Sequence, residues 1–178
     1  KDTIECLESV YQITYPNYDV IVVDNGSEDE SLEKINEYAE GKLEVISKFS
    51  EDRYGNKPLQ YLECAQKDAG GRGKETAEAT TLPPQGKLIL IKNEKNYGFA
   101  EGNNIAIRYA LKILNSQYIL LLNNDTVVER DFLDELVCTA SFDERIGFVG
   151  PKTYYYDYHG RKDVINFAGG KLIMWKGK

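Results

Sequence analysis

Three short apolar segments, each ending abruptly in a cluster of polar residues, constrain this chain more than any other feature. The segments are DVIVV at residues 19–23, KLILIK at 87–92 and YILLL at 118–122. Continuous runs of valine, isoleucine and leucine are typical of strands buried on both faces of a parallel sheet. The polar clusters that follow them are DNGSEDES, NYGFAEGNN and NND. Because ligands of parallel sheets bind beyond the carboxyl ends of the strands, the three clusters are candidate parts of one site.

Helical patterns separate the apolar segments. Apolar side chains recur at helical spacing in four segments, which are residues 3–13, 30–40, 105–113 and 131–141. Two further short strands are expected at residues 43–46 and 146–150. Strands that alternate with helices predict an α/β fold, with a mostly parallel sheet and helices on both of its faces.

The length of 178 residues suits one domain with a sizeable core, so residues 1–178 are assigned to a single domain. Residues 48–86 interrupt the alternation of strands and helices. This stretch is polar and contains GG, RG and PP dipeptides, which favour an insertion on the surface, with a small hairpin around Tyr61. A tyrosine-rich strand is expected at 154–158, and an apolar patch at 171–175 ends the chain.

Composition excludes several classes of protein. The formal net charge of −7 leaves no general basic surface for nucleic acid, and an anionic substrate must therefore meet a metal ion or a helix N-terminus. Three cysteines without C-x-x-C spacing and a single histidine argue against a disulfide framework, a zinc site and Ser-His-Asp chemistry. No segment reaches the roughly 20 apolar residues of a membrane span. A cytoplasmic location is expected, in solution or peripheral at the cytoplasmic face of the membrane.

Two of the clusters admit both a ligand-binding and a purely structural interpretation. Asp24 follows four apolar residues directly, and its carboxylate would accept hydrogen bonds from a nucleobase imide or a ribose hydroxyl. An Asn-Gly turn and a helix cap explain residues 25–29 without a ligand, but they do not explain Asp24. Gly98 and Gly102 open a helix whose N–H groups would face an anion, or they serve a turn with positive φ. Their spacing matches neither a dinucleotide-binding motif nor a P-loop.

Asp125 ends the NND cluster and is the candidate metal ligand. Mg²⁺ and Mn²⁺ prefer carboxylate, phosphate and water oxygens, so one carboxylate suffices when the substrate brings a diphosphate. The amide neighbours Asn123 and Asn124 complete the cluster. For NND by itself, an Asx-rich turn that ends a strand is the simpler interpretation.

In this order, VIVVDNGSEDES, NYGFAEGNN and YILLLNNDT resemble the signature blocks of the glycosyltransferase family 2 enzymes. These enzymes have the GT-A nucleotide-sugar fold, so the resemblance implies a Rossmann-like α/β domain. N-x-D in place of D-x-D, combined with N-x-G-F-A-x-G-N-N, is most similar to the rhamnosyltransferase-type branch. The resemblance covers most of the chain apart from residues 48–86.

The resemblance implies a role for each matching residue. Asp24 matches the Asp that hydrogen-bonds the pyrimidine ring, and Asp125 matches the Asp that binds the divalent metal, Mg²⁺ or Mn²⁺. Asn123 matches a position near the ribose, where this chain has an amide in place of the usual carboxylate. The residues expected to line the nucleotide-sugar pocket are Asp24, Asn25, Gly98, Gly102, Asn104, Asn123 and Asn124.

The resemblance also implies a reaction and a missing part. It implies metal-dependent, inverting transfer of a sugar from a dTDP- or UDP-linked donor to a glycan, polysaccharide or lipid-linked acceptor. Members of the family have an apolar strand before the first helix and an acidic catalytic base in a C-terminal acceptor-binding half. Neither is found here, so the chain is expected to be a fragment that binds the donor without a complete active site. A sheet edge left open by the missing strand would favour homo-oligomers.

Two other classes of function remain open. A sugar nucleotidyltransferase would need a Gly-rich loop with a basic residue after its first strand, a region that this sequence lacks. A non-catalytic or degenerate nucleotide-sugar-binding module would bind the same nucleotide and metal without turnover. An acidic base downstream of the donor site distinguishes an enzyme from such a module.

Overall fold

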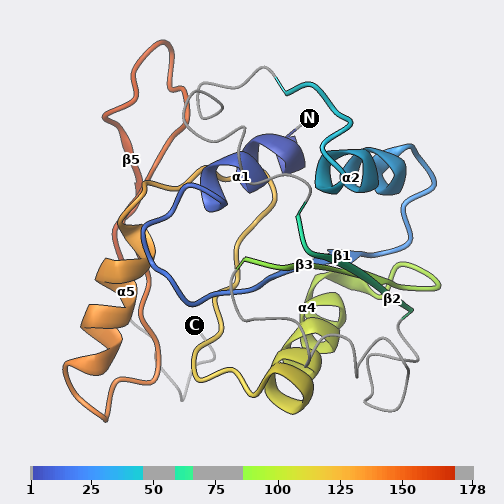
Figure 1. Cartoon of the computed structure of the whole chain (residues 1–178). Helices are drawn as coiled ribbons and strands as arrows, with labels where there is room; N and C mark the ends of the chain where they lie inside the picture. The colour runs from blue at the N-terminus through green and yellow to red at the C-terminus, as the bar shows by residue number, and fades with distance from the viewer. Residues whose placement is uncertain (1, 46–58, 66–85, 171–178) are drawn as a thin grey trace.

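The computed structural model describes residues 2–45, 59–65 and 86–170. At its centre lies a parallel sheet of three strands in the order β1-β3-β2 (Figure 1). The strands are β1 (Val20–Asp24), β2 (Tyr61–Ala65) and β3 (Leu88–Lys92). The first residues of β1 and β2 both lie opposite the first residue of β3, so the three strands end at the same edge of the sheet.

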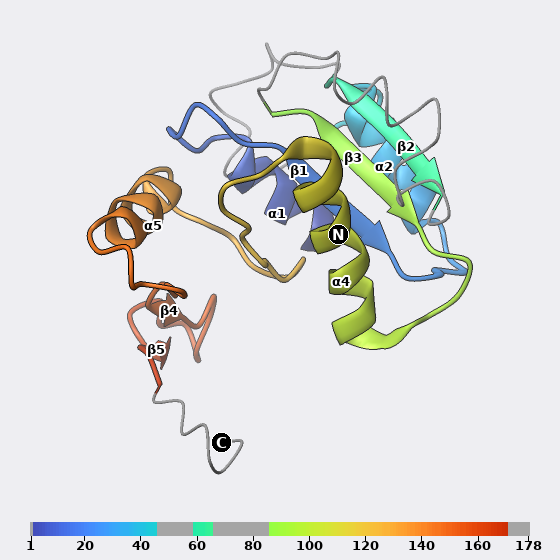
Figure 2. The ribbon, with the colours of Figure 1, turned by 90° about the horizontal axis from the view of Figure 1, so that it is seen from below.

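Helices cover both faces of this sheet. The helices α1 (Asp2–Val10) and α2 (Ser31–Ala39) lie over one face. Helix α4 (Gly98–Tyr109) lies over the other face and continues as a π-helical turn, η3 (Ala110–Leu114). Figure 2 shows α4 on the near side of the sheet, with α1 and α2 behind it. The expected α/β class, with a mostly parallel sheet and helices on both faces, is confirmed.

The central strand β3 shows why these elements pack in layers. Leu88 and Leu90 pack against α1 and α2, whereas Ile89 and Ile91 pack against α4, because side chains alternate between the faces of a strand. The cluster beneath α1 and α2 consists of Ile4, Leu7, Ile35, Tyr38, Ala39, Leu88 and Leu90. The cluster beneath α4 consists of Leu62, Cys64, Ile89, Ile91, Ile105 and Tyr109.

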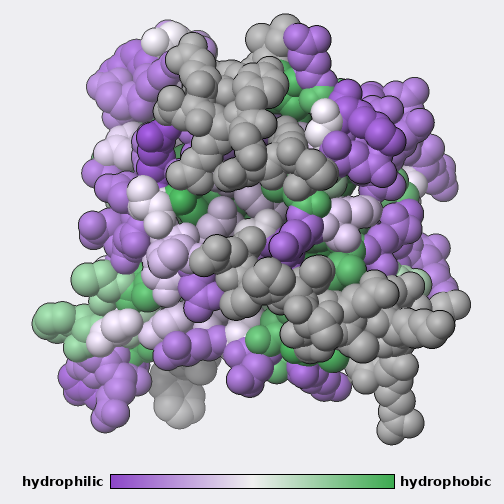
Figure 3. All heavy atoms as spheres, viewed as in Figure 1, coloured by the Kyte–Doolittle hydropathy of each residue, from purple (hydrophilic) through white to green (hydrophobic). Residues whose placement is uncertain are grey.

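The C-terminal part of the described chain is much less buried than this core. It contains α5 (Phe132–Ser141) and an antiparallel pair, β4 (Thr153–Tyr154) and β5 (Ile165–Phe167). The β4–β5 pair lies apart from the main sheet (Figure 2), and no residue of α5 is fully buried. Hydrophobic residues reach the surface beside α5, among polar ones (Figure 3). No helix in the described ranges is long and apolar enough to cross a membrane.

Two of the expected strands are wrong. Residues 118–122 and 146–150 belong to no strand, and Leu121 and Phe148 in them are 55% and 99% exposed. A strand forms only where its backbone N–H and C=O groups pair with a neighbouring strand. Within the part of the chain that the structure describes, neither segment has such a partner. The tyrosine-rich strand is confirmed only at Tyr154, the last residue of β4.

The outer strand of the sheet differs from the expectation at residues 43–46. Leu43 and Val45 form no strand and pack instead beside the cluster beneath α1 and α2, and residue 46 lies outside the described ranges. The place beside β3 is taken by β2, which falls within the stretch interpreted as a surface insertion. The hairpin expected around Tyr61 is therefore wrong, because these residues form a parallel strand of the sheet.

Other expectations fall on residues that the structure does not describe. The remainder of the insertion, residues 46–58 and 66–85, lies outside the described ranges, as does the apolar patch at 171–175. The assignment of residues 1–178 to a single domain stays a prediction.

Candidate functional site

The ends of β1 and β3 bring two of the three polar clusters together. Asp24, the last residue of β1, lies opposite Lys92, the last residue of β3. The backbone N–H of Asn93 then donates to the backbone carbonyl of Asp24 at 3.0 Å. The loop after β1 and the loop before α4 therefore lie side by side at the carboxyl edge of the sheet, where a parallel sheet binds its ligands.

Asp24 is held by its own loop. Its side chain is buried, and its carboxylate accepts hydrogen bonds from the backbone N–H groups of Gly26 at 3.2 Å and Ser27 at 3.2 and 3.3 Å. A carboxylate has about four acceptor positions, so Asp24 retains capacity for another donor. The turn fixes this side chain before any ligand arrives.

Asn25 joins the two loops through its side-chain amide. Its Oδ1 accepts from Asn93 Nδ2 at 3.0 Å and from the Tyr97 backbone N–H at 3.1 Å. Its Nδ2 donates to Asn96 Oδ1 at 2.9 Å and to the Gly98 carbonyl at 3.2 Å. One side chain after β1 thus contacts three residues of the segment between β3 and α4, and the first residue of α4 as well.

The two glycines of this cluster take different positions on α4. Gly98 begins the helix with a φ of +80° and donates its backbone N–H to Asn96 Oδ1 at 2.8 Å. Gly102 lies one turn later and is buried, and a Cβ built on it would lie 3.4 Å from the Nδ2 of Asn25. Both glycines therefore lie next to Asn25, as expected for a loop that opens a helix.

Asn104 lies apart from this group. It is exposed on α4, and its Nδ2 donates to Glu101 Oε2 at 3.4 Å. Glu101 also forms an ion pair with Arg108, two helical turns further on, and these contacts lower the pKa of the Glu101 carboxyl. Asn104 therefore belongs to a charged face of α4. Gly98 and Gly102 belong instead to the loop junction, by which we mean the place where the loop after β1 meets residues 93–98 and the first turn of α4.

The NND cluster, residues 123–125, packs against helix α1. The Nδ2 of Asn124 donates to Thr3 Oγ1 at 2.9 Å, and the Cys6 thiol lies 3.7 Å from the carbonyl of Asn123. Further along, the N–H of Val128 donates to Ser9 Oγ at 3.2 Å. The cluster was expected directly after a strand, and this is wrong, because it forms a turn fastened to a helix. Among the described residues, no hydrogen bond links Asn123, Asn124 or Asp125 to the loop junction.

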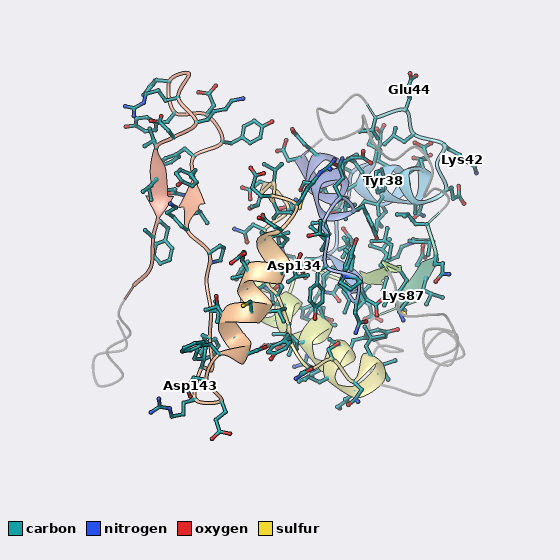
Figure 4. The ribbon with its side chains drawn as sticks, turned by 60° about the vertical axis from the view of Figure 1, so that its left-hand side comes forward. Tyr38, Lys42, Glu44, Lys87, Asp134 and Asp143 are labelled. Carbon is teal, nitrogen blue, oxygen red and sulfur yellow. The ribbon has the colours of Figure 1, made fainter. Side chains whose placement is uncertain are left out.

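The segment that follows the turn is fastened to the chain after α1. Thr14 donates its backbone N–H to the carbonyl of Arg130 at 2.8 Å, and its hydroxyl contacts the carboxylate of Asp134. Figure 4 shows Asp134 on the side of α5 that faces the body of the molecule. Helix α1 thus contacts the NND turn, and Thr14, shortly after α1, contacts Arg130 and the start of α5.

Asp125 is exposed at the tip of this turn. Within residues 2–45, 59–65 and 86–170, no group of three or more His, Cys, Asp and Glu side chains could enclose a metal ion. A cation held here would take one protein carboxylate, and its other ligands would be water or phosphate oxygens. That donor set suits a hard cation such as Mg²⁺ or Mn²⁺.

Sequence reasoning missed Cys6 as a neighbour of the candidate metal ligand. The pKa of the Cys6 thiol is raised to about 11, mainly by burial and in smaller part by the negative charge of Asp125, against a hydrogen bond to the Thr126 backbone that lowers it. Thr3, Cys6 and Ser9 contact the NND turn and the residues after it from positions three apart on α1. Small polar residues at that spacing share a helix face, which is a weak signal in the sequence for such a contact.

Iodoacetamide is expected to label Cys138 in the folded protein and to spare Cys6 and Cys64. Cys138 is exposed and the other two cysteines are buried. The Cys6 thiol, with a pKa of about 11, carries little thiolate near neutral pH. Mass spectrometry after labelling with and without urea tests this expectation. Labelling of Cys6 without urea would contradict the packing of α1 against the NND turn.

Comparison with known proteins finds one family model that matches the N-terminal part of the chain. Residues 1–68 match the model of the family described as Glycosyl transferase family 2. The matched residues include α1, β1, α2 and β2, and so Asp24 and Asn25, but not the start of α4 or the NND turn. No curated protein and no solved structure matches the chain. The layered α/β sheet therefore agrees with the GT-A fold, and residues 1–68 of the chain are similar to the glycosyl transferase family 2 model.

Proposed function

We propose that this chain carries the nucleotide-sugar donor site of a glycosyltransferase. The observation that carries the proposal is the family match over residues 1–68, which contains Asp24 at the carboxyl edge of a parallel sheet. Nucleotides bind at that edge in open α/β sheets. The loop after β1 and the start of α4 meet there, which gives the nucleotide a carboxylate and a helix N-terminus within one loop junction.

Asp24 would recognise the pyrimidine ring. A buried carboxylate with acceptor capacity left over pairs best with a ligand N–H donor, and the imide N–H of uracil or thymine is such a donor. The preferred nucleotides are therefore UDP and dTDP. The two backbone N–H groups that hold the carboxylate make this contact preorganised.

Asp125 would hold the divalent cation, with Asn123 and Asn124 beside it on the same turn. The formal net charge of −7 repels a nucleoside diphosphate, so the ligand needs local positive charge. Mg²⁺ or Mn²⁺ bound by Asp125 and the phosphate oxygens would supply that charge and stabilise the departing diphosphate. The first turn of α4 offers further N–H groups to the phosphates, because its N-cap residue Tyr97 makes no side-chain cap and, among the described residues, only the N–H of Gly98 is taken, by Asn96 Oδ1.

The finer assignment follows from the motifs. N-x-G-F-A-x-G-N-N and N-x-D favour a rhamnosyltransferase-type enzyme, and the family chemistry favours inversion and a glycan, polysaccharide or lipid-linked acceptor. The three contacts proposed above concern the donor alone, so they hold for any sugar that a UDP or dTDP carrier brings.

Calorimetric titration of UDP and dTDP, with and without Mn²⁺, tests the donor site. Asp125→Asn is expected to remove the metal-dependent part of the affinity, a loss of about tenfold or more, because the cation loses its only proposed carboxylate. Asp24→Asn is expected to weaken UDP and uridine by a similar factor, because both ligands carry the imide.

Asp143→Asn is the matched control for these variants. Asp143 is a partly exposed carboxyl beyond α5, far from the sheet (Figure 4), where Arg145 lowers its pKa. This substitution is expected to leave every dissociation constant unchanged. If neither nucleotide binds the unmodified chain in the presence of Mn²⁺, the proposed donor site is wrong.

A further inference from the structure

All hydrogen-bonding groups of the Asn25 side chain are paired with residues 93–98. A carboxamide has two acceptor positions on its oxygen and two N–H donors. In Asn25 all four are used, by Asn93, Tyr97, Asn96 and Gly98. The sequence predicted that this residue contacts the nucleotide, but no donor or acceptor of its amide is left for a ligand.

Two backbone partners fix the orientation of this amide. The N–H of Tyr97 can only donate, so it requires the oxygen of Asn25, and the carbonyl of Gly98 can only accept, so it requires the nitrogen. With the oxygen of Asn25 set as an acceptor, Asn93 must present its nitrogen to it. The arrangement is therefore determined by the backbone at the start of α4.

One atom of the network is left without a partner. Asn93 is buried, and its Oδ1 has no hydrogen bond within the described residues. An unpaired buried acceptor lowers stability, and such groups in native proteins call for an explanation. A network arranged only for stability would not leave this oxygen unpaired, whereas one that holds two loops in a required geometry can tolerate it.

The loops on either side of Asn25 are in close contact. A Cβ on Gly26 would lie 2.9 Å from the carbonyl carbon of Lys95, and Gly102 of α4 packs against the Asn25 amide. Small movements of Asn25 therefore move the N-terminal turn of α4 relative to Asp24. The distance between these two groups is the quantity that a bound nucleotide must match.

From these contacts we propose that Asn25 is a positioning residue of the donor site. It holds the segment 93–98 and the first turn of α4 at a fixed distance from the Asp24 carboxylate, so that one nucleoside diphosphate reaches both. The inference rests on the proposed function, because the ligand is the nucleotide assigned there. Asn25 acts through its protein partners and makes no contact with the nucleotide itself.

Hydrogen exchange and nucleotide titration on two variants test this role. Asn25→Ala removes the amide, and Asn25→Leu removes it while keeping a side chain of similar size. Both are expected to speed exchange of the Tyr97 amide about tenfold or more in the free chain, because that N–H loses its acceptor. Both are also expected to weaken UDP binding about tenfold or more at a temperature where the variants are folded, since the two contact groups lose their spacing.

The control is Asn17→Ala, at an exposed asparagine before β1, at the opposite end of that strand. It is expected to change neither exchange nor affinity. Faster exchange with an unchanged dissociation constant would show a purely structural role and overturn the inference. Weaker binding with unchanged exchange at Tyr97 would show direct ligand contact and overturn it as well.

Failure of the proposed function gives a different result. In that case the unmodified chain binds neither UDP nor dTDP, and the role of Asn25 in a donor site falls with it. The exchange data on the free chain still decide whether Asn25 couples the two loops, because that measurement needs no ligand.

Discussion

Replacing Gly26 with alanine is expected to destabilise the fold by about 2–5 kcal/mol and to weaken nucleotide binding. Two costs add at this position. Gly26 has a φ of +82°, a conformation that costs an L-residue about 1–2 kcal/mol. The new Cβ would also lie 2.9–3.0 Å from backbone atoms of Lys95 and Asn96. Because these are backbone atoms, the clash is relieved only if the whole loop moves away from Asp24.

Gly98→Ala separates the two costs. Gly98 has nearly the same φ, +80°, but a Cβ there would meet nothing within 4 Å. Its replacement is therefore expected to cost only the backbone strain, about 1–2 kcal/mol. Urea unfolding followed by circular dichroism measures both variants. An equal loss at the two glycines would show that the loops have room to separate, and would contradict the close contact at Gly26.

Much of the layered fold could be predicted because its strands and helices are marked locally. β1 and β3 are continuous apolar runs, and each is followed by a polar turn, which identifies a buried parallel strand. β2 could not be found in this way. Its sequence, YLECA, carries Glu63 in the middle and lies at an edge of the sheet, where one exposed side chain is tolerated. The polar residues on both sides of this short strand made the whole stretch look like a surface insertion, so the strand was not predicted.

Residues 118–122 show the opposite error. YILLL is the most apolar run of the chain, and its composition favours a strand. Strand structure also requires a partner whose backbone lies within hydrogen-bond reach, and that is a property of the tertiary fold. Propensity alone therefore predicted a strand where the described part of the molecule forms none.

The candidate site was predictable only where the sheet itself assembles it. Asp24 ends β1 and Gly98 comes shortly after β3, and because these are neighbouring parallel strands the proximity of the two residues follows from topology. The contact between Cys6 and the NND turn joins residues 117 positions apart, so no local sequence pattern predicts it. The role of Asn25 was likewise hidden, because a sequence shows that an asparagine is present but not which partners use its amide.

Leu90→Ala is expected to destabilise the protein by about 2–5 kcal/mol, a large share of the roughly 5–15 kcal/mol that stabilises a typical domain. Leu90 is fully buried in the central strand, where it packs beneath α1 and α2. Its truncation leaves a cavity between the sheet and the helix that also holds the NND turn. Loosening α1 is therefore expected to weaken metal-dependent nucleotide binding as well as stability.

Leu111→Ala removes the same atoms from a side chain that is 54% exposed. It is expected to change stability by no more than about 0.5 kcal/mol, because no cavity forms. Urea unfolding of both variants, with UDP and Mn²⁺ titrated into each folded protein, separates the two effects. If Leu90→Ala lowers stability but keeps the full metal-dependent affinity, the NND turn does not depend on α1 for its position. A loss of both would mean that the packing beneath α1 sets the place of Asp125.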